Sequence, residues 1–423
     1  MRSLAYRLAL LLVFAVPWEA AVQVGSLGRG SKLIGAALAV VWLLSIVGRG
    51  RLREPGDFQK TLFLFTVWSG LTLLWSIDTD ATVSGFRTSA QLLVLVMILW
   101  DLFDTREAVE TALQAYVLGA FVTCGSIIAN YLTAPEAKYP THFRVNALGF
   151  ETDGIAFIVA AAGPAAWYLA ASSSSWKRSS LVRLVNYSYL PIGLFSIILT
   201  GTRGATVASI PTAIFVLWSL RTAGRTTRRV VAAAFAATII GLLAIAPQGQ
   251  LDRIGTTVTA TDPGRQGSAL SGRWTIWQAS GQAFVEKPVG GVGLDAHRLA
   301  VAYELGQVRV LTGYEKEAHN AYLSILTETG IVGIVLFALV LLCVFASVRK
   351  LRGWEAWYWS SQLAVLAIGA MSLSLEASKS VWIFLALSVC FAAAPESAFL
   401  AARRDWSAGA SSLGTSLRAQ PYR

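Results

Sequence analysis

Charged side chains are scarce in this chain of 423 residues. Asp, Glu, Lys and Arg make up 14% of it, against about 25% in soluble globular domains. This excludes an ordinary soluble protein, because 55% of the residues are hydrophobic and the few charges leave long apolar runs between them. The composition predicts an all-α protein that crosses a membrane many times.

Cysteine is also rare, and its placement excludes two classes of site. Cys124, Cys343 and Cys390 all lie within apolar runs, where a free cysteine behaves as a small buried hydrophobe. They form neither a disulfide framework nor a zinc-binding spacing. The net charge of +11 comes without a run of basic residues interleaved with aromatics. We therefore expect no nucleic-acid partner, and assign the excess of cations to cytoplasmic loops.

Twelve apolar segments are candidates for membrane spans, since about 20 apolar residues cross a hydrocarbon core of roughly 30 Å. The first resembles a signal peptide but is expected to be retained. The segments lie near residues 4–24, 32–47, 60–77, 88–103, 107–132, 152–171, 187–201, 204–220, 229–247, 320–348, 356–376 and 379–401.

Basic residues support this count. With the amino terminus inside, 21 of the 35 basic residues fall on the cytoplasmic side and 7 in the short outer connections, as the positive-inside rule requires. The other 7 lie in the long outer loop, which the rule does not count. Residues 187–220 are too long for one crossing, so we divide them at residues 200–204, where two glycines permit a sharp turn.

The chain therefore divides into four parts. Residues 1–247 form a transmembrane bundle, 248–318 a long periplasmic loop, 319–401 three further spans, and 402–423 a disordered cytoplasmic tail. The loop is expected to contain two helices. One, capped by Ser271, runs from Arg273 to Glu286 and is stopped by Pro288. Asp295 is expected to cap the second.

Three residues could carry chemistry at the outer surface. His319 lies where the long loop meets the tenth span, and histidine gains or loses a proton near neutral pH. Arg203 lies between two apolar segments, and Arg273 begins a loop helix. A guanidinium group matches phosphate oxygens with two parallel hydrogen bonds. Two such groups at one site repel each other unless an anion lies between them, which favours a diphosphate ligand.

Plainer roles stay open for these residues. Arg203 and Arg273 could hold helix ends at the membrane interface, where arginine side chains snorkel. His319 could begin a helix without any chemical role. Secondary candidates for substrate binding are Asn320, Tyr314, Lys316 and Arg87.

We predict no metal site. A hard cation needs several converging oxygen ligands, and the close pair of acids formed by Asp78 and Asp80 on the outer side is too small for this. His142 and His297 belong to no motif and are expected to have structural roles.

Several short motifs resemble those shared by bacterial O-antigen ligases, O-antigen polymerases and O-linked oligosaccharyltransferases. The pattern of His, then Asn, nine residues, Gly, two residues and Gly is met by His319, Asn320, Gly330 and Gly333. Further similar elements are residues 75–78 (WSID), 202–204 (TRG), 271–277 (SGRWTIW) and 287–294 (KPVGGVGL). One departure is Val207, where family members often have leucine four residues after a key arginine.

The resemblance implies a GT-C-like membrane glycosyltransferase that needs no metal and no cofactor. Its donor would be a glycan on undecaprenyl diphosphate and its acceptor the lipid A–core of lipopolysaccharide, at the periplasmic face of the bacterial inner membrane. His319 would be the general base, and Arg203 and Arg273 would bind the diphosphate and stabilise the leaving group. Direct displacement would invert the anomeric centre.

Other functions remain open. A polymerase of the same superfamily would join repeat units, and an oligosaccharyltransferase would modify protein, but the chain has neither two large outer loops nor a large soluble carboxyl-terminal part. A flippase for lipid-linked sugars is the alternative outside the enzymes. Such a transporter is expected to place ionisable residues near the bilayer midplane.

Overall fold

The computed structural model describes residues 1–23, 29–133, 151–172, 179–221, 270–306 and 318–395, with isolated positions between 145 and 149 and between 224 and 236. The regular elements in these ranges are all helices, which confirms the all-α prediction. Most of the predicted span 229–247, much of the predicted outer loop and the carboxyl-terminal tail lie outside the described residues, so the domain boundaries there stay predictions.

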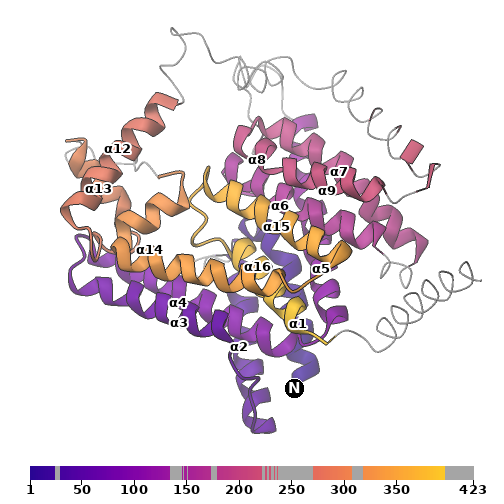
Figure 1. Cartoon of the computed structure of the whole chain (residues 1–423), viewed down its shortest axis with the longest axis horizontal. Coiled ribbons are helices and arrows are strands. Elements are labelled where there is room, and N and C mark those ends of the chain that lie inside the picture. Colours follow the sequence, from indigo (N-terminus) through magenta and orange to yellow (C-terminus); the bar gives the residue numbers. More distant parts are fainter. Residues whose placement is uncertain are drawn as a thin grey trace, which may run out of the picture.

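The helices are arranged as a bundle with a small group attached at one corner (Figure 1). They are α1 (Arg2–Ala15), η1 (Val16–Ala21), α2 (Gly30–Arg49), α3 (Asp57–Leu71), η3 (Thr72–Leu74), α4 (Thr79–Leu102), α5 (Arg106–Thr133), α6 (Thr152–Ala171), α7 (Ser180–Thr200), α8 (Arg203–Ala208), α9 (Ile210–Leu220), α12 (Leu270–Glu286), α13 (His297–Glu304), α14 (Ala321–Val348), α15 (Gly353–Ala370) and α16 (Lys379–Ala393).

Eight stretches of helix in the described ranges are long and apolar enough to cross a membrane. Three more predicted spans are present as helices but fall short of those limits, namely α3, α15 and α16. The protein is thus a multi-pass membrane protein, while the count of twelve stays a prediction. The eight stretches are Arg2–Ala21, Gly30–Arg49, Thr79–Leu102, Arg106–Thr133, Thr152–Ala171, Ser180–Thr200, Arg203–Leu220 and Ala321–Val348.

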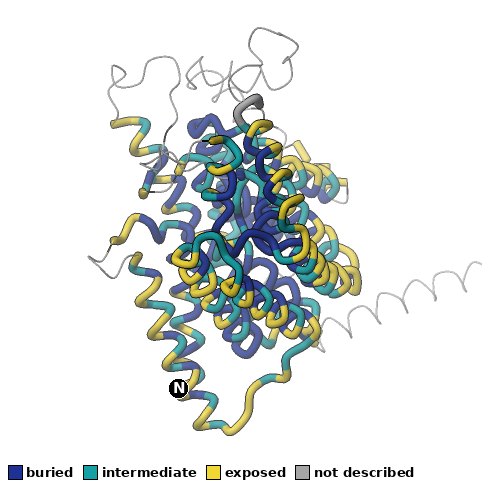
Figure 2. The backbone as a smooth tube through the Cα atoms, turned by 90° about the vertical axis from the view of Figure 1, so that its left-hand side faces the viewer, coloured by how far each residue is buried: buried dark blue, intermediate teal, exposed yellow. Residues whose placement is uncertain are grey.

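Helix α6 forms the centre of the bundle. Every residue from Ile155 to Ala170 is buried, and the helix packs against α5, α7 and α15. Its many alanines let neighbouring helices approach closely, which favours association within a membrane. The buried segments gather along the middle of the molecule, with exposed apolar residues outside them (Figure 2).

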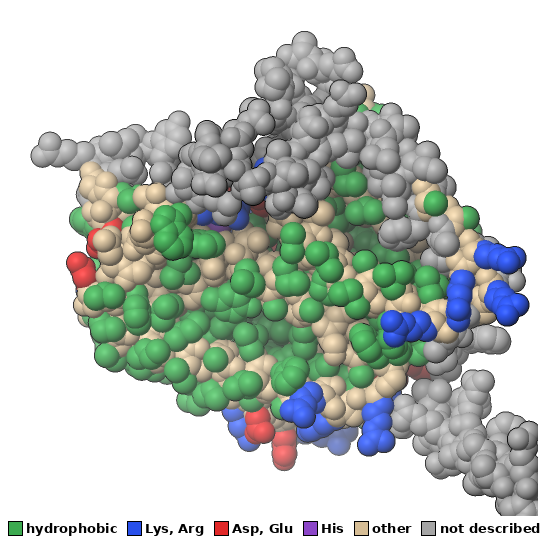
Figure 3. Space-filling model, turned by 45° about the horizontal axis from the view of Figure 1, so that its top comes forward, with side chains coloured by type: hydrophobic (Ala, Val, Ile, Leu, Met, Phe, Trp, Pro, Cys, Tyr) green, Lys and Arg blue, Asp and Glu red, His purple; other side chains and the backbone are tan. Residues whose placement is uncertain are grey.

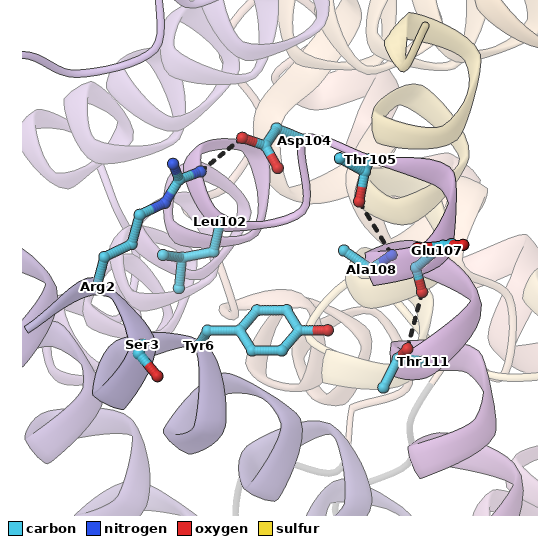
Figure 4. A pocket seen from close by; sticks show the side chains of 9 residues that line it. All are labelled: Arg2, Ser3, Tyr6, Leu102, Asp104, Thr105, Glu107, Ala108 and Thr111. Atoms are coloured by element: carbon cyan, nitrogen blue, oxygen red, sulfur yellow. Dashed lines mark hydrogen bonds and ion pairs between the residues drawn. The ribbon is translucent and has the colours of Figure 1, made fainter. Parts of the chain in front are cut away.

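Basic side chains gather at the edges of a broad apolar surface (Figure 3). At the end near the amino terminus, buried Asp101 accepts hydrogen bonds from Arg49 at 2.8 Å and from Trp42 at 3.1 Å. Arg2 forms an ion pair with Asp104 at 2.7 Å. Beside it lies a pocket of about 540 Å³ between α1 and the start of α5, across which Tyr6 points (Figure 4). Arg2 and Arg49 lie at helix ends that the sequence assigns to the cytoplasm.

The long apolar segment at residues 187–220 is divided at residues 200–204, as predicted. Helix α7 ends at Thr200, and Gly201 adopts a left-handed conformation with φ of 60°. Helix α8 then begins at Arg203. A residue with a Cβ atom is strained in that conformation, which explains the glycine.

Candidate functional site at one end of the bundle

Helix α14 is broken at Gly330, which has φ of 68° and ψ of −167°. In an unbroken helix, the carbonyls of residues 327–329 would accept hydrogen bonds from the amides of residues 331–333. The break removes these bonds, and a buried carbonyl without a partner is costly. The replacement donors are the amides of Val292 and Gly293, at 3.0 Å each, and the indole of Trp68, at 2.9 Å.

The outer-loop turn at residues 287–294 provides two of those donors and fills the break. The carbonyl of Pro288 accepts a hydrogen bond from the amide of Ile331 at 2.8 Å. Gly291 has φ of 71°, and a Cβ atom there would overlap the backbone of Glu328. The glycines of this motif are therefore required for backbone to lie directly against backbone.

The turn between α3 and α4 encloses the other side of the same segment. The amide of Ile77 donates to the carbonyl of Val292 at 2.9 Å. The indole of Trp75 donates to the carbonyl of Gly290 at 3.1 Å. Three motifs far apart in sequence (residues 75–78, 287–294 and the start of α14) thus form one packed unit.

Substituting Gly330 tests this unit. Gly330→Ala should lower stability by about 1–3 kcal/mol or more, because alanine is strained in this backbone conformation and its Cβ atom would overlap the carbonyl of Val289. Thermal unfolding of the purified variant in detergent measures the loss. Gly125→Ala is the matched control, since a Cβ atom there meets nothing within 4 Å. Equal melting temperatures for the two variants would contradict the account.

His319 lies immediately before α14 in a strained conformation. Its φ is 47°, which costs a residue other than glycine roughly 1–2 kcal/mol. The next residue, Asn320, caps the helix by accepting hydrogen bonds from the amides of Tyr322 and Leu323 at 3.1 and 3.2 Å. The imidazole is half-buried, and its Nδ1 atom is buried without a hydrogen-bond partner in the described part of the chain. Such strain is typical of residues held for function.

Arg273 is carried by α12, which docks beside His319. One helical turn after Arg273, the indole of Trp277 donates to the carbonyl of Ala318 at 3.0 Å. Helix α12 ends at Glu286, as Pro288 predicts, but it begins at Leu270, so the predicted cap at Ser271 is wrong. The predicted cap of the second loop helix is wrong: α13 starts at His297 with Ala296 as its capping residue and no side-chain cap. Asp295 instead has φ of 61°.

Arg203 is the first residue of α8. The loop at residues 371–378, between α15 and α16 (Figure 1), connects this end of α8 to α14. A Cβ atom on Gly204 would lie 2.8 Å from Cβ of Ser372. The adjacent Leu373 accepts a hydrogen bond from the amide of Ala321 at 3.1 Å. One chain of contacts thus runs from beside Arg203, past His319, to the helix of Arg273.

The secondary candidates for substrate binding do not all lie at this site. Asn320 has the capping role described above, and Tyr314 and Lys316 lie outside the described residues. Arg87 is exposed on α4, two residues beyond Gly85, which packs against Leu294 and Asp295. No hydrogen bond or ion pair in the described ranges joins its side chain to His319, Arg203 or Arg273.

Two acids near this site were not singled out by sequence. Ser324 Oγ lies 3.1 Å from Glu328 Oε1 and 3.0 Å from Glu376 Oε1. Glu328 is buried and Glu376 half-buried. Glu376 lies 52 residues beyond Ser324, so sequence spacing gives no signal of the contact.

His297 has the structural surroundings expected of it. It is buried, and Nε2 lies 2.8 Å from Ser280 Oγ on α12. Burial, reinforced by the charge of Arg298, lowers the pKa of His297 to about 4. It is therefore neutral at neutral pH and joins α13 to α12.

The fold and this cluster define a multi-pass membrane protein with a polar site at one end of an apolar bundle. The family model described as O-antigen ligase matches residues 189–338, from α7 to α14. The matched segment, about a third of the chain, is therefore similar to the O-antigen ligase family. The matched segment includes Arg203, Arg273 and His319. No sequence among the curated proteins matches this chain.

Proposed function

We propose that the protein is an inverting, metal-independent glycosyltransferase that moves an O-antigen glycan from undecaprenyl diphosphate to the lipid A–core of lipopolysaccharide. The observation that supports this best is the single contact chain joining the backbones next to Arg203, His319 and Arg273. A reaction of this kind needs a proton acceptor and a receptor for a diphosphate, and the cluster offers both.

In this proposal His319 removes the proton from an acceptor sugar hydroxyl as that oxygen attacks the anomeric carbon. The bond from that carbon to the diphosphate oxygen breaks at the same time, and the electron pair leaves with the diphosphate. Arg203 and Arg273 stabilise the charge that develops there, which is often the largest contribution in such sites. A diphosphate is a good leaving group, so no acid is needed to protonate it.

A retaining route would need a carboxylate nucleophile close to the sugar. The carboxyl groups of Glu328 and Glu376 both contact the hydroxyl of Ser324. Glu328 is also buried. We propose inversion in a single displacement, with the active site in the periplasm at the surface of the inner membrane.

Purified protein in detergent, supplied with lipid-linked glycan and lipid A–core, tests the proposal. We expect a product with the summed mass of acceptor and glycan, an inverted anomeric centre by NMR, and equal rates with and without EDTA. A retained anomer or a chelator-sensitive rate would overturn the mechanism.

Changing the acceptor separates the alternatives. Transfer to a second lipid-linked glycan would identify a polymerase, and transfer to peptide an oligosaccharyltransferase. No transfer in detergent, together with movement of the lipid-linked glycan across sealed vesicles, would identify a flippase, since a flippase needs a sealed membrane.

A further inference from the structure

We infer that Glu376 is a positioning residue that fixes the spacing between Arg203 and His319, an inference that rests on the proposed function. Glu376 belongs to the loop at residues 371–378, which touches both sides of the candidate site. Ser372 of this loop lies against Gly204, next to Arg203. Leu373 accepts the hydrogen bond from Ala321, two residues after His319.

Glu376 joins this loop to α14 by its side chain and to α16 by its backbone. Its Oε1 atom lies 3.0 Å from Ser324 Oγ, one turn into α14. Its carbonyl accepts a hydrogen bond from the indole of Trp382 at 2.7 Å. The loop is thus held at both ends, and the Ser324 bond is its side-chain connection to the helix that follows His319.

The same hydroxyl also reaches the break in α14. Ser324 Oγ lies 3.1 Å from Glu328 Oε1, and the carbonyl of Glu328 accepts a hydrogen bond from Gly293 at 3.0 Å. The line of bonds therefore runs from the 287–294 turn, through Glu328 and Ser324, to the loop that packs on α8. A shift of this loop would move Arg203 relative to His319.

The number of protons available for the hydrogen bonds at Ser324 determines which substitution keeps them. A serine hydroxyl donates one hydrogen bond, while an ionised carboxylate only accepts. Ser324 can hydrogen-bond to both carboxyl groups at once only if one of them carries a proton and donates to it. Glutamine imitates a protonated carboxyl group, because its amide both donates and accepts. A glutamine at position 376 should therefore keep the connection, and an alanine should lose it.

We expect the two variants Glu376→Gln and Glu376→Ala to differ in kcat. We expect Glu376→Ala to lower kcat about 10- to 100-fold, because misplacing reacting groups by about 1 Å costs this much, while KM for the donor changes less than about threefold. Glu376→Gln should stay near the wild-type kcat. Ser324→Ala removes the hydroxyl that joins Glu376 to α14 and is a smaller change in side-chain size. It replaces Glu376→Ala in this test if that variant does not fold. Glu355→Ala, which breaks the 2.8 Å ion pair with Arg106, is the matched control for losing a carboxylate elsewhere.

A distance measurement makes the test independent of activity. Spin labels on exposed Val207 of α8 and exposed Ile331 of α14, in a Cys343→Ser background, report the spacing by pulsed electron paramagnetic resonance. We expect a broader distribution in Glu376→Ala and an unchanged one in Glu376→Gln and Glu355→Ala.

The outcomes are distinct. Unchanged distances in Glu376→Ala would overturn the inference, whether or not activity falls. Loss of kcat in both Glu376 variants with unchanged distances would show that the carboxylate acts in the chemistry and does not position the loop. A wild-type protein without transfer activity, combined with broadened distances in Glu376→Ala, would overturn the proposed function and leave the positioning role standing.

Discussion

Replacing His319 with alanine is expected to lower kcat for glycan transfer by about 10²- to 10⁴-fold, the range that a positioned proton acceptor contributes. The variant should fold and still bind the lipid-linked donor, because Asn320, and not His319, caps α14. Steady-state transfer with purified protein measures kcat, and binding of labelled undecaprenyl diphosphate measures the donor site separately.

A second variant separates the chemistry from the backbone strain. His319 has φ of 47°, so His319→Gly should be more stable than His319→Ala by about 1 kcal/mol and equally inactive. Added imidazole should restore part of the activity of the glycine variant.

His297→Ala is the histidine control. It removes a buried side chain hydrogen-bonded to Ser280, so it should lower the melting temperature while the folded fraction keeps its kcat. Normal transfer by both His319 variants would remove this residue from the mechanism.

Much of the helix pattern follows from local signals. Gly201 ends α7 within the predicted turn, and Pro288 stops α12 near Glu286. These features depend on a few neighbouring residues whose conformational limits are fixed by their own chemistry. Asp295 is an exception to its local signal, because its backbone is left-handed and the helix begins after Ala296.

The break in α14 could not be predicted in the same way. Residues 320–348 are apolar enough for one continuous span, and Gly330 alone does not interrupt a helix. The break is stable because Val292, Gly293 and Trp68 satisfy the freed carbonyls, and these donors come from two distant segments. The motif match pointed to the glycines, but only the packed structure gives the physical reason for them.

The polar contacts within the site could not be predicted from the sequence either. The bond between Glu376 and Ser324 joins residues 52 positions apart, and the contact of Ser372 with Gly204 joins two different helix ends. Sequence placed Arg203, Arg273 and His319 at the outer surface through the order of spans. Their mutual placement depends on a loop that no motif marked.

Replacing either arginine with alanine is expected to lower kcat by about 10²- to 10³-fold, the typical effect of removing one donor that stabilises developing negative charge. Arg203→Lys and Arg273→Lys should recover only part of this loss, since lysine keeps the charge but cannot make two parallel hydrogen bonds. Arg349→Ala is the control, because Arg349 is exposed just beyond the other end of α14 and lies over the Phe345 ring.

The two arginines should also be coupled, because both would contact the same diphosphate. In the Arg203→Ala/Arg273→Ala protein, the loss should be smaller than the product of the two single losses. Inhibition by free undecaprenyl diphosphate gives an independent measurement, and its inhibition constant should rise in each alanine variant. Independent, multiplicative effects would indicate separate sites, and alanine variants with normal inhibition and transfer would contradict the diphosphate receptor altogether.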